Sequence, residues 1–191
     1  RDALSLIHEQ HDFIPVTPSV ILQLHRDLMV HTAISYGGHW KDSDNEIISI
    51  DDQGNRFVRF RPPSALATPG LIKEACQSLN DALSRQVCDP LLISFRFIFD
   101  FVSIHPFNDG NGRMSRLLTT LLLEKTGYDV ARYISIVRLI EDNKALYYNA
   151  LAASSIGWNE NQNTEAPFIR FMLGTTLAAY RQLEQRTLIE S

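Results

Sequence analysis

The chain has 191 residues, of which 45% are hydrophobic, so one domain with a substantial core is expected. Its formal net charge of −4 argues against non-specific binding of nucleic acid. No apolar run reaches the roughly 18 residues of a transmembrane helix, and no segment has the pattern of a secretion signal. The two cysteines, Cys76 and Cys88, lack a metal-ligand spacing and are predicted to be reduced thiols, which favours a cytoplasmic protein.

The first third of the chain is predicted to contain two helices and a β-hairpin. Apolar residues recur at helical spacing in residues 2–11, and the Thr17-Pro18 pair is typical of a helix start, from which a second helix is expected to reach about Tyr36. β-Branched and aromatic residues on both sides of a turn-forming sequence predict a hairpin over about residues 45–60. Because a lone hairpin is marginally stable in water, it is expected to pack on the helices.

The remainder of the chain is predicted to be helical. Apolar periodicity, bounded by proline, glycine and polar residues, predicts helices over 69–86, 90–105, 113–125, 140–155 and 164–188. The predicted fold class is therefore all-α, a helical bundle with one small β-hairpin. We expect residues 1–17 to be a truncated N-terminal helical extension and residues 18–191 to form one domain.

Most of the reactive side chains lie in one stretch, residues 105–116, with the sequence HPFNDGNGRMSR. Its central Gly-Asn-Gly is unsuited to a helix interior, because each glycine there costs roughly 1 kcal/mol relative to alanine. The pattern predicts a helix, a tight glycine loop and a second helix, whose first N–H groups can bind an anion. The structural alternative is a glycine cap followed by a helix with surface arginines.

The side chains of this stretch suit transfer of a phosphate-containing group. His105, at the mouth of the predicted loop, is a candidate base near neutral pH. Asp109 can hold Mg²⁺ through oxygen when the metal also binds phosphates. Asn111 supplies a donor or caps the next helix, and Arg113 and Arg116 share one helix face beside the anion site. Such chemistry depends mostly on positioning and charge neutralisation.

Residues 105–116 resemble the signature of the Fic family, His-x-Phe-x-(Asp/Glu)-Gly-Asn-Gly-Arg-x-x-Arg, at every specified position. Residues 38–63 look like the flap hairpin of that family, and the Tyr147-Tyr148 pair looks like its tyrosines near adenine, so the resemblance covers about residues 18–180. It implies a Fic-type helical bundle and a nucleotidyltransferase that carries out AMPylation. Such enzymes use ATP and Mg²⁺ and transfer AMP to a Ser, Thr or Tyr hydroxyl of a target protein.

The resemblance also implies roles for individual residues. His105 would deprotonate the target hydroxyl, with Asn111 and Arg116 completing the catalytic set, and Asp109 would bind Mg²⁺. Ile47 or Ile48 of the flap would clamp a target segment that binds as an added strand. The implied nucleotide-binding set, from the loop anchor through the phosphate contacts to the adenine contacts, is Phe107, Gly110, Asn111, Gly112, Arg113, Arg116, Tyr147 and Tyr148.

Other functions and structural roles remain open at the level of sequence. A second hypothesis is an enzyme of the same type that transfers UMP, phosphocholine or phosphate instead of AMP. Phosphate-transferring relatives, however, depart from the Asp-Gly-Asn-Gly-Arg sequence that is present here. A binding or regulatory module is a further alternative, which the intact His105 and Arg116 disfavour. Tyr147 and Tyr148 are equally compatible with ordinary core or surface aromatics, and the hairpin with a structural ribbon.

Many Fic proteins are inhibited by a glutamate in the sequence (Ser/Thr)-x-x-x-Glu-(Gly/Asn), which pairs with the second arginine of the motif. Glu9 lies in a near match that ends in Gln10, and Glu184 lies in one that begins with Tyr180. Because neither matches fully, the site is expected either to be uninhibited or to be inhibited by a preceding segment or a separate partner. The expected partners are ATP, a protein target and that inhibitor, with self-modification and a homodimer also compatible, but no membrane and no nucleic acid.

The five histidines outside the motif show no metal-ligand spacing. They are predicted to lie on helix surfaces or in solvent. They are His8, His11, His25, His31 and His39.

Overall fold

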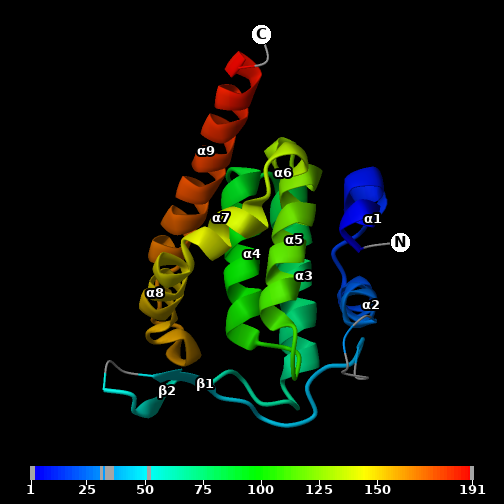
Figure 1. Cartoon of the computed structure of the whole chain (residues 1–191). Coiled ribbons are helices and arrows are strands. Elements are labelled where there is room, and N and C mark those ends of the chain that lie inside the picture. The colour runs from blue at the N-terminus through cyan, green and yellow to red at the C-terminus, as the bar shows by residue number, and fades with distance from the viewer. Residues whose placement is uncertain (1–2, 31, 33–36, 51–52, 190–191) are drawn as a thin grey trace.

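The computed structural model describes residues 3–30, 32, 37–50 and 53–189. In this part of the chain, the secondary structure is a bundle of helices and one two-stranded sheet, so the predicted all-α class with a single hairpin is confirmed (Figure 1). The elements are α1 (Ala3–Gln10), α2 (Pro18–Met29), β1 (Ile47–Ile50), β2 (Arg56–Phe60), α3 (Thr68–Arg85), α4 (Pro90–Ile104), α5 (Asn111–Lys125), α6 (Val130–Tyr133), α7 (Ile136–Asp142), α8 (Lys144–Ser155) and α9 (Ala166–Ile189), with short 3₁₀ turns at His11–Phe13 and Trp158–Glu160.

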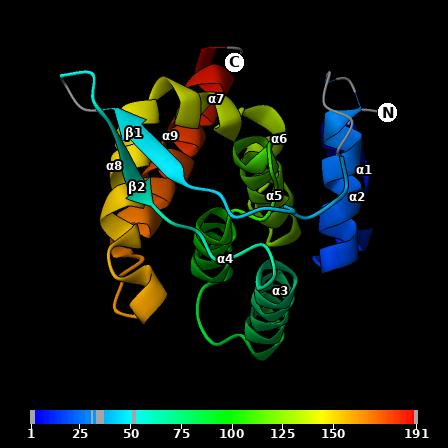
Figure 2. The ribbon, with the colours of Figure 1, turned by 90° about the horizontal axis from the view of Figure 1, so that it is seen from below.

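Helix α4 is the centre of the bundle, because most of its surface is apolar. Ten of its fifteen residues are buried, and it packs on α3, α5 and α9. Figure 2 shows these helices around α4, with α1 and α2 beyond α5. The start of α4 is set locally, since the Asp89 carboxylate accepts a hydrogen bond from the Leu91 N–H at 2.8 Å and Pro90 occupies the first turn.

The hairpin lies across the end of the bundle at which α4 leads into α5 (Figure 1). Its strands are antiparallel, with Ile48 opposite Val58 and Ile50 opposite Arg56. Strand β2 contacts α8, so the hairpin packs on the helices as expected. The predicted turn lies partly outside the described residues, which omit residues 51–52.

Two helix predictions were wrong in extent. The helix from Pro18 ends at Met29, because the Thr32 hydroxyl and N–H both bond to the Met29 carbonyl, at 2.8 and 2.9 Å, and close a turn there. Residues 33–36, which include the predicted end at Tyr36, lie outside the described residues. The single helix predicted over 140–155 is interrupted at Asn143, whose side-chain amide bonds back to the Leu139 carbonyl at 2.9 Å.

Three smaller features were not predicted. Helix α5 begins at Asn111 rather than Arg113, because the sharp turn is confined to Gly110. Helix α7 begins earlier than expected, where the Ser135 hydroxyl accepts the Arg138 N–H at 3.2 Å. The short helix α6 has too few residues to show a periodic pattern.

Candidate active site

The predicted glycine loop connects α4 to α5. His105 ends α4 in a left-handed conformation, with φ 51°, and donates its N–H to the Phe101 carbonyl at 3.1 Å. A non-glycine residue in this conformation costs about 1–2 kcal/mol, so the surrounding contacts must hold it there. The half-buried imidazole faces a cavity instead of continuing the apolar surface of α4.

Phe107 fastens the loop to the body of the protein. Its side chain is fully buried. The ring stacks on the His25 ring, with centroids 3.6 Å apart and planes 8° apart, and on the Trp40 ring at 5.3 Å. Phe107 therefore has no exposed surface that could contact a ligand, and it does not line the cavity. Its position is that of an anchor for the loop.

Asn111 closes the loop on itself. Its Oδ1 accepts the Phe107 N–H at 2.9 Å, and its Nδ2 donates to the Phe107 carbonyl at 2.7 Å. The side chain therefore holds the loop closed, and it does not cap α5, which is one of the two roles predicted for it. Its backbone N–H still belongs to the first turn of α5.

The start of α5 offers backbone N–H groups to an anion. The first hydrogen bond within α5 runs from the Met114 N–H to the Gly110 carbonyl at 2.8 Å, so the N–H groups of residues 111–113 have no acceptor in the helix. Gly110 has φ +84°, and a Cβ there would lie 3.1 Å from His25 Nε2. Both constraints require glycine at this position.

Each motif arginine has a carboxylate partner. Arg113 pairs with Asp109 at 3.1 Å across one turn, and both side chains are partly exposed. Arg116 pairs at 3.1 Å with Glu141 of α7, a residue that sequence reasoning missed. An anionic ligand that binds either arginine has to replace or share that carboxylate.

Two hollows meet at His105. The first, of about 450 Å³, is lined by β1 and by residues of β2, α4, α5 and α8: Ile47, Ile48, Ser49, Ile50, Arg59, Val102, His105, Asn111, Gly112, Arg116, Tyr147, Tyr148 and Leu151. The second, of about 300 Å³, follows the glycine loop and also includes Glu141 and Lys144. The structure thus brings the motif, the predicted flap residues and the tyrosine pair to one site.

The electrostatic environment keeps His105 neutral. Burial lowers the pKa of its imidazole to about 4, and the charges of Lys41 and Arg59 act in the same direction, while the backbone at Val102 opposes them. The imidazole is therefore deprotonated at pH 7 and able to accept a proton.

The two tyrosines differ in environment. Tyr147 is almost fully buried against Phe168 and Phe171, and burial raises its pKa to about 12. Tyr148 is 41% exposed at the cavity edge, and the Arg59 guanidinium lies 5.6 Å from its ring centroid. Tyr147 thus belongs to the core and also lines the cavity. Tyr148 packs against Arg59, a residue that was not predicted to belong to the site.

His25 was predicted on a helix surface or in solvent, and that prediction was wrong. It is 2% exposed, its Nδ1 accepts the Gly38 N–H at 3.0 Å, and its Nε2 lies 3.0 Å from the Asp109 carbonyl. These partners require a neutral ring with the proton on Nε2, and burial lowers its pKa. Its contacts come from segments distant in sequence, so no local pattern could reveal them.

His8 and His11 contact the buried carboxylate of Glu124, also contrary to the surface prediction. His39 is exposed, as predicted, and His31 lies outside the described residues.

Asp109 is the one predicted metal ligand, and its surroundings fit Mg²⁺. Among the described residues, no group of three or more His, Cys, Asp or Glu side chains is arranged to hold a metal ion. Mg²⁺ in nucleotide sites takes one or two carboxylates and obtains its other ligands from phosphates and water. The half-exposed Asp109 carboxylate beside the α5 N-terminus suits that mode of binding.

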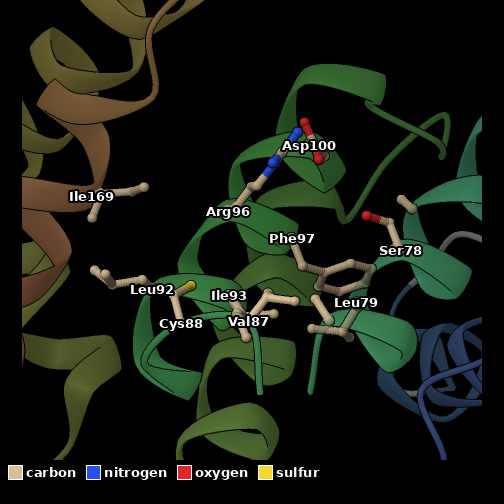
Figure 3. Close-up of a pocket in the computed structure, with 12 residues that line it drawn as sticks. Ser78, Leu79, Val87, Cys88, Leu92, Ile93, Arg96, Phe97, Asp100 and Ile169 are labelled. Atoms are coloured by element: carbon tan, nitrogen blue, oxygen red, sulfur yellow. The ribbon is translucent and has the colours of Figure 1, made fainter. Parts of the chain in front are cut away.

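A separate cavity of about 230 Å³ lies among α3, α4 and α9 (Figure 3). Its lining is mainly apolar, with Arg96 and Asp100 together at one side, and it contains the Cys88 side chain. Burial raises the pKa of Asp100 to about 6. None of the predicted site residues lines it, so it is distinct from the site at His105.

Comparison with known proteins gives the family. Residues 15–123, more than half of the chain, match the model of the Fic/DOC family. The chain belongs to the Fic/DOC family. The protein adenylyltransferase fic-1 of Caenorhabditis elegans is 27% identical to this Fic chain over 168 residues, and the Fic adenylyltransferase of Aedes aegypti is 26% identical over 167 residues. These alignments cover 88% and 87% of this chain but 28% of each relative, so the chain spans less than a third of their length.

Solved structures share the Fic fold. A Fic family protein from Desulfovibrio desulfuricans G20 matches with a TM-score of 0.75 and 26% identity, over 97% of this chain and 51% of that one. BepC from Bartonella tribocorum, solved with bound AMPPNP, matches with a TM-score of 0.58 and 12% identity, over 90% of this chain and 80% of that one, which supports the fold alone. In the described part of the chain, no helix is both long and apolar enough to cross a membrane.

Proposed function

We propose that this Fic domain is a protein adenylyltransferase, which transfers AMP from ATP to a Ser, Thr or Tyr hydroxyl of a target protein. The observation that carries the proposal is a neutral His105 imidazole at the junction of the hairpin-lined cavity and the glycine loop. The names of the curated relatives, which are protein adenylyltransferases, support a nucleotide substrate.

In this proposal, ATP lies along both hollows. The backbone N–H groups of residues 111–113 and the Arg113 guanidinium bind the α- and β-phosphates, and Arg116 binds the γ-phosphate. The adenine ring lies in the more apolar hollow, beside Val102, Tyr147 and Leu151. The Asp109 carboxylate would hold Mg²⁺, which when bound neutralises charge on the phosphate oxygens.

The proposed reaction is a displacement at the α-phosphorus. His105 accepts the proton of the target hydroxyl while its oxygen attacks that phosphorus. A new phosphorus–oxygen bond forms, the bond from the α-phosphorus to the bridging oxygen breaks, and pyrophosphate leaves with the electron pair. The loop N–H groups and both motif arginines stabilise the charge on the phosphates.

The hairpin would hold the target next to this base. Strand β1 pairs with β2 along one edge, and the described residues supply no strand for its other edge. A target segment can add there through backbone hydrogen bonds, with Ile47 or Ile48 against its side chains. Self-modification follows the same geometry if the segment belongs to this protein.

The proposal is tested with radiolabelled nucleotides and intact-mass analysis. Purified protein with Mg²⁺ and α-labelled ATP is expected to label itself or a protein of a lysate, whereas γ-labelled ATP gives no label. His105→Ala should abolish the label while circular dichroism shows an unchanged fold. Transfer of the γ-label would instead establish phosphate transfer, and a mass increase corresponding to UMP or phosphocholine, with UTP or CDP-choline as donor, would replace AMP as the transferred group.

A further inference from the structure

We infer that Lys41 is a positioning residue for the base: it holds the backbone on both sides of His105 and places a positive charge beside the imidazole. The inference rests on the proposed role of His105. Lys41 lies in the segment before the hairpin and is not part of the Fic motif.

Lys41 bonds to the residue before His105 and to the residue after it. Its Nζ donates to the Ile104 carbonyl at 3.1 Å, and its backbone N–H donates to the Pro106 carbonyl at 2.8 Å. Ile104 is the last residue of α4, where carbonyls have no helical donor. One residue therefore holds the backbone carbonyls of both residues that flank His105 in the sequence.

These bonds explain how His105 keeps its left-handed conformation. With φ 51°, the residue is held in a sparsely populated region of backbone space. Such strain persists only where the surroundings over-determine the geometry. The Lys41 side chain is 3% exposed, so its two bonds are shielded from water.

The same segment links the base to the hairpin. Lys41 Nζ also donates to Asn45 Oδ1 at 3.1 Å, and β1 begins at Ile47. Asp44 accepts the Ala65 N–H at 2.7 Å and so ties this segment to the chain that follows β2. The proposed target-binding edge and the proposed base are thus positioned from one short segment.

The charge of Lys41 distinguishes it from a simple brace. A buried ammonium with neutral acceptors costs free energy, which an uncharged donor would avoid. Burial lowers the pKa of Lys41 to about 8, although Asp44 opposes this, so the ammonium form dominates at pH 7. Its charge lowers the pKa of His105 and favours the form that accepts a proton.

Other charged and titratable groups also face His105. Arg59 of β2 is cationic and lowers the pKa of His105, and the backbone at Val102 of α4 raises it. Arg116 of α5 shares the cavity but is paired with Glu141, and α8 contributes the phenols of Tyr147 and Tyr148. Lys41 is the one that also bonds to the backbone next to His105.

The test compares Lys41→Met, which keeps the stem but removes the charge, with Lys41→Arg. Lys125→Met is a matched control, because Lys125 also bonds to two backbone carbonyls, those of His11 and Asp12, but at the far end of α5. Histidine-ring ¹⁵N NMR titrations of the whole chain, with His105 assigned from a His105→Gln spectrum, give the pKa directly. We expect Lys41→Met to raise the His105 pKa by roughly half a pH unit or more, and Lys41→Arg and Lys125→Met to leave it nearly unchanged.

Transfer kinetics provide a second readout. Lys41→Met should lower kcat about tenfold or more, because a misplaced base loses rate, and should leave the KM for ATP within about twofold. Lys41→Arg should recover part of the rate. Equal loss of kcat in Lys41→Met and Lys125→Met, or an unchanged His105 pKa in Lys41→Met, would overturn the inference.

If Lys41→Met fails to fold, Asn45→Asp is used instead. It keeps Lys41 but adds a negative charge in contact with Nζ, so the His105 pKa should rise, and an unchanged value would contradict the inference. The NMR readout needs no transfer activity. A protein that transfers no AMP but shows the expected titrations would refute the proposed function and not the proposed control of His105 by Lys41.

Discussion

At the scale of single residues, His105 is kept neutral by burial and by neighbouring cations, and none of the described carboxylates is among the groups that shift its pKa. A carboxylate would raise the pKa of the imidazole, whereas desolvation and Lys41 lower it. The proposed base is thereby neutral across the physiological pH range, and we propose that the bonds from Lys41 to the Ile104 and Pro106 carbonyls orient it.

The pH dependence of transfer should show this shift. A pKa of about 4 for His105 means that the neutral base persists well below pH 6.5, so the transfer rate is expected to fall to half near pH 4 to 5. Initial rates between pH 4 and 8 would measure it, with circular dichroism confirming the fold at each pH. Half-maximal rate near pH 6.5 would contradict the prediction. Because the unfolded chain binds more protons between about pH 4 and 6.5, His105 should also make stability rise with pH over that window.

Glu141 pairs with Arg116, the residue that binds the γ-phosphate in the proposed function. Glu141→Gln removes the negative charge that Arg116 contacts at 3.1 Å. Since a partly exposed ion pair is worth up to about 1 kcal/mol, the KM for ATP should fall about two- to fivefold, with kcat little changed. Asp142→Asn is the control, because Asp142 contacts only the exposed Arg138, at 3.8 Å, among the described residues. Equal KM values for Glu141→Gln and the wild-type protein would show that the pair does not limit ATP binding.

At the scale of elements, the hairpin contributes to the proposed nucleotide site as well as to the proposed target edge. Arg59 of β2 lines the cavity against Tyr148, and no ion pair joins it to the described residues. Arg61, two residues further along the chain, is exposed and pairs with Glu46 at 2.9 Å. Arg59 therefore lies in the cavity, whereas Arg61 lies on the surface.

Substituting each arginine tests this division. Arg59→Gln is expected to raise the KM for the nucleotide about three- to tenfold, because it removes a cation from the cavity and its stacking on Tyr148. Arg61→Gln should leave that KM within about twofold, since an exposed ion pair contributes little. Steady-state kinetics at saturating target would measure both, and an equal effect of the two substitutions would contradict a cavity role for Arg59.

The buried carboxylate of Glu124 joins α1 and α6 to α5. Its side chain is fully buried, with His8 Nδ1 at 2.6 Å and both His11 Nδ1 and Arg132 Nε at 3.5 Å. Glu124→Gln removes the buried negative charge that faces the Arg132 guanidinium and should lower the free energy of unfolding by about 2–3 kcal/mol. Urea denaturation would measure it, with the exposed Glu184→Gln expected within about 0.5 kcal/mol of the wild type. A similar stability for both variants would show that α1 is held by apolar packing alone.

At the scale of the whole molecule, the site is assembled from three regions that are distant in sequence. The hairpin, the α4–α5 loop and α8 meet at one end of the bundle, and the buried α4 carries His105 to that end (Figures 1 and 2). The near-match glutamates of the inhibitory sequence lie elsewhere: Glu184 is in the last turns of α9, which extend at the opposite end (Figure 1). The partner of Arg116 is Glu141, which belongs to neither near match.

The sequence by itself determined the features that depend on local physics. Apolar periodicity and capping residues specify most of the helices, β-branched runs specify the hairpin, and the 105–116 motif specifies the glycine loop and the family. The tertiary structure decided what depends on contacts between distant segments. Three examples are His25 stacked on Phe107, Lys41 beside His105 and Glu141 paired with Arg116. Nothing in the sequence around each of these residues distinguishes it from an ordinary polar or charged residue. Their roles exist only because folding desolvates them against the loop, and burial and proximity are properties that no local pattern encodes.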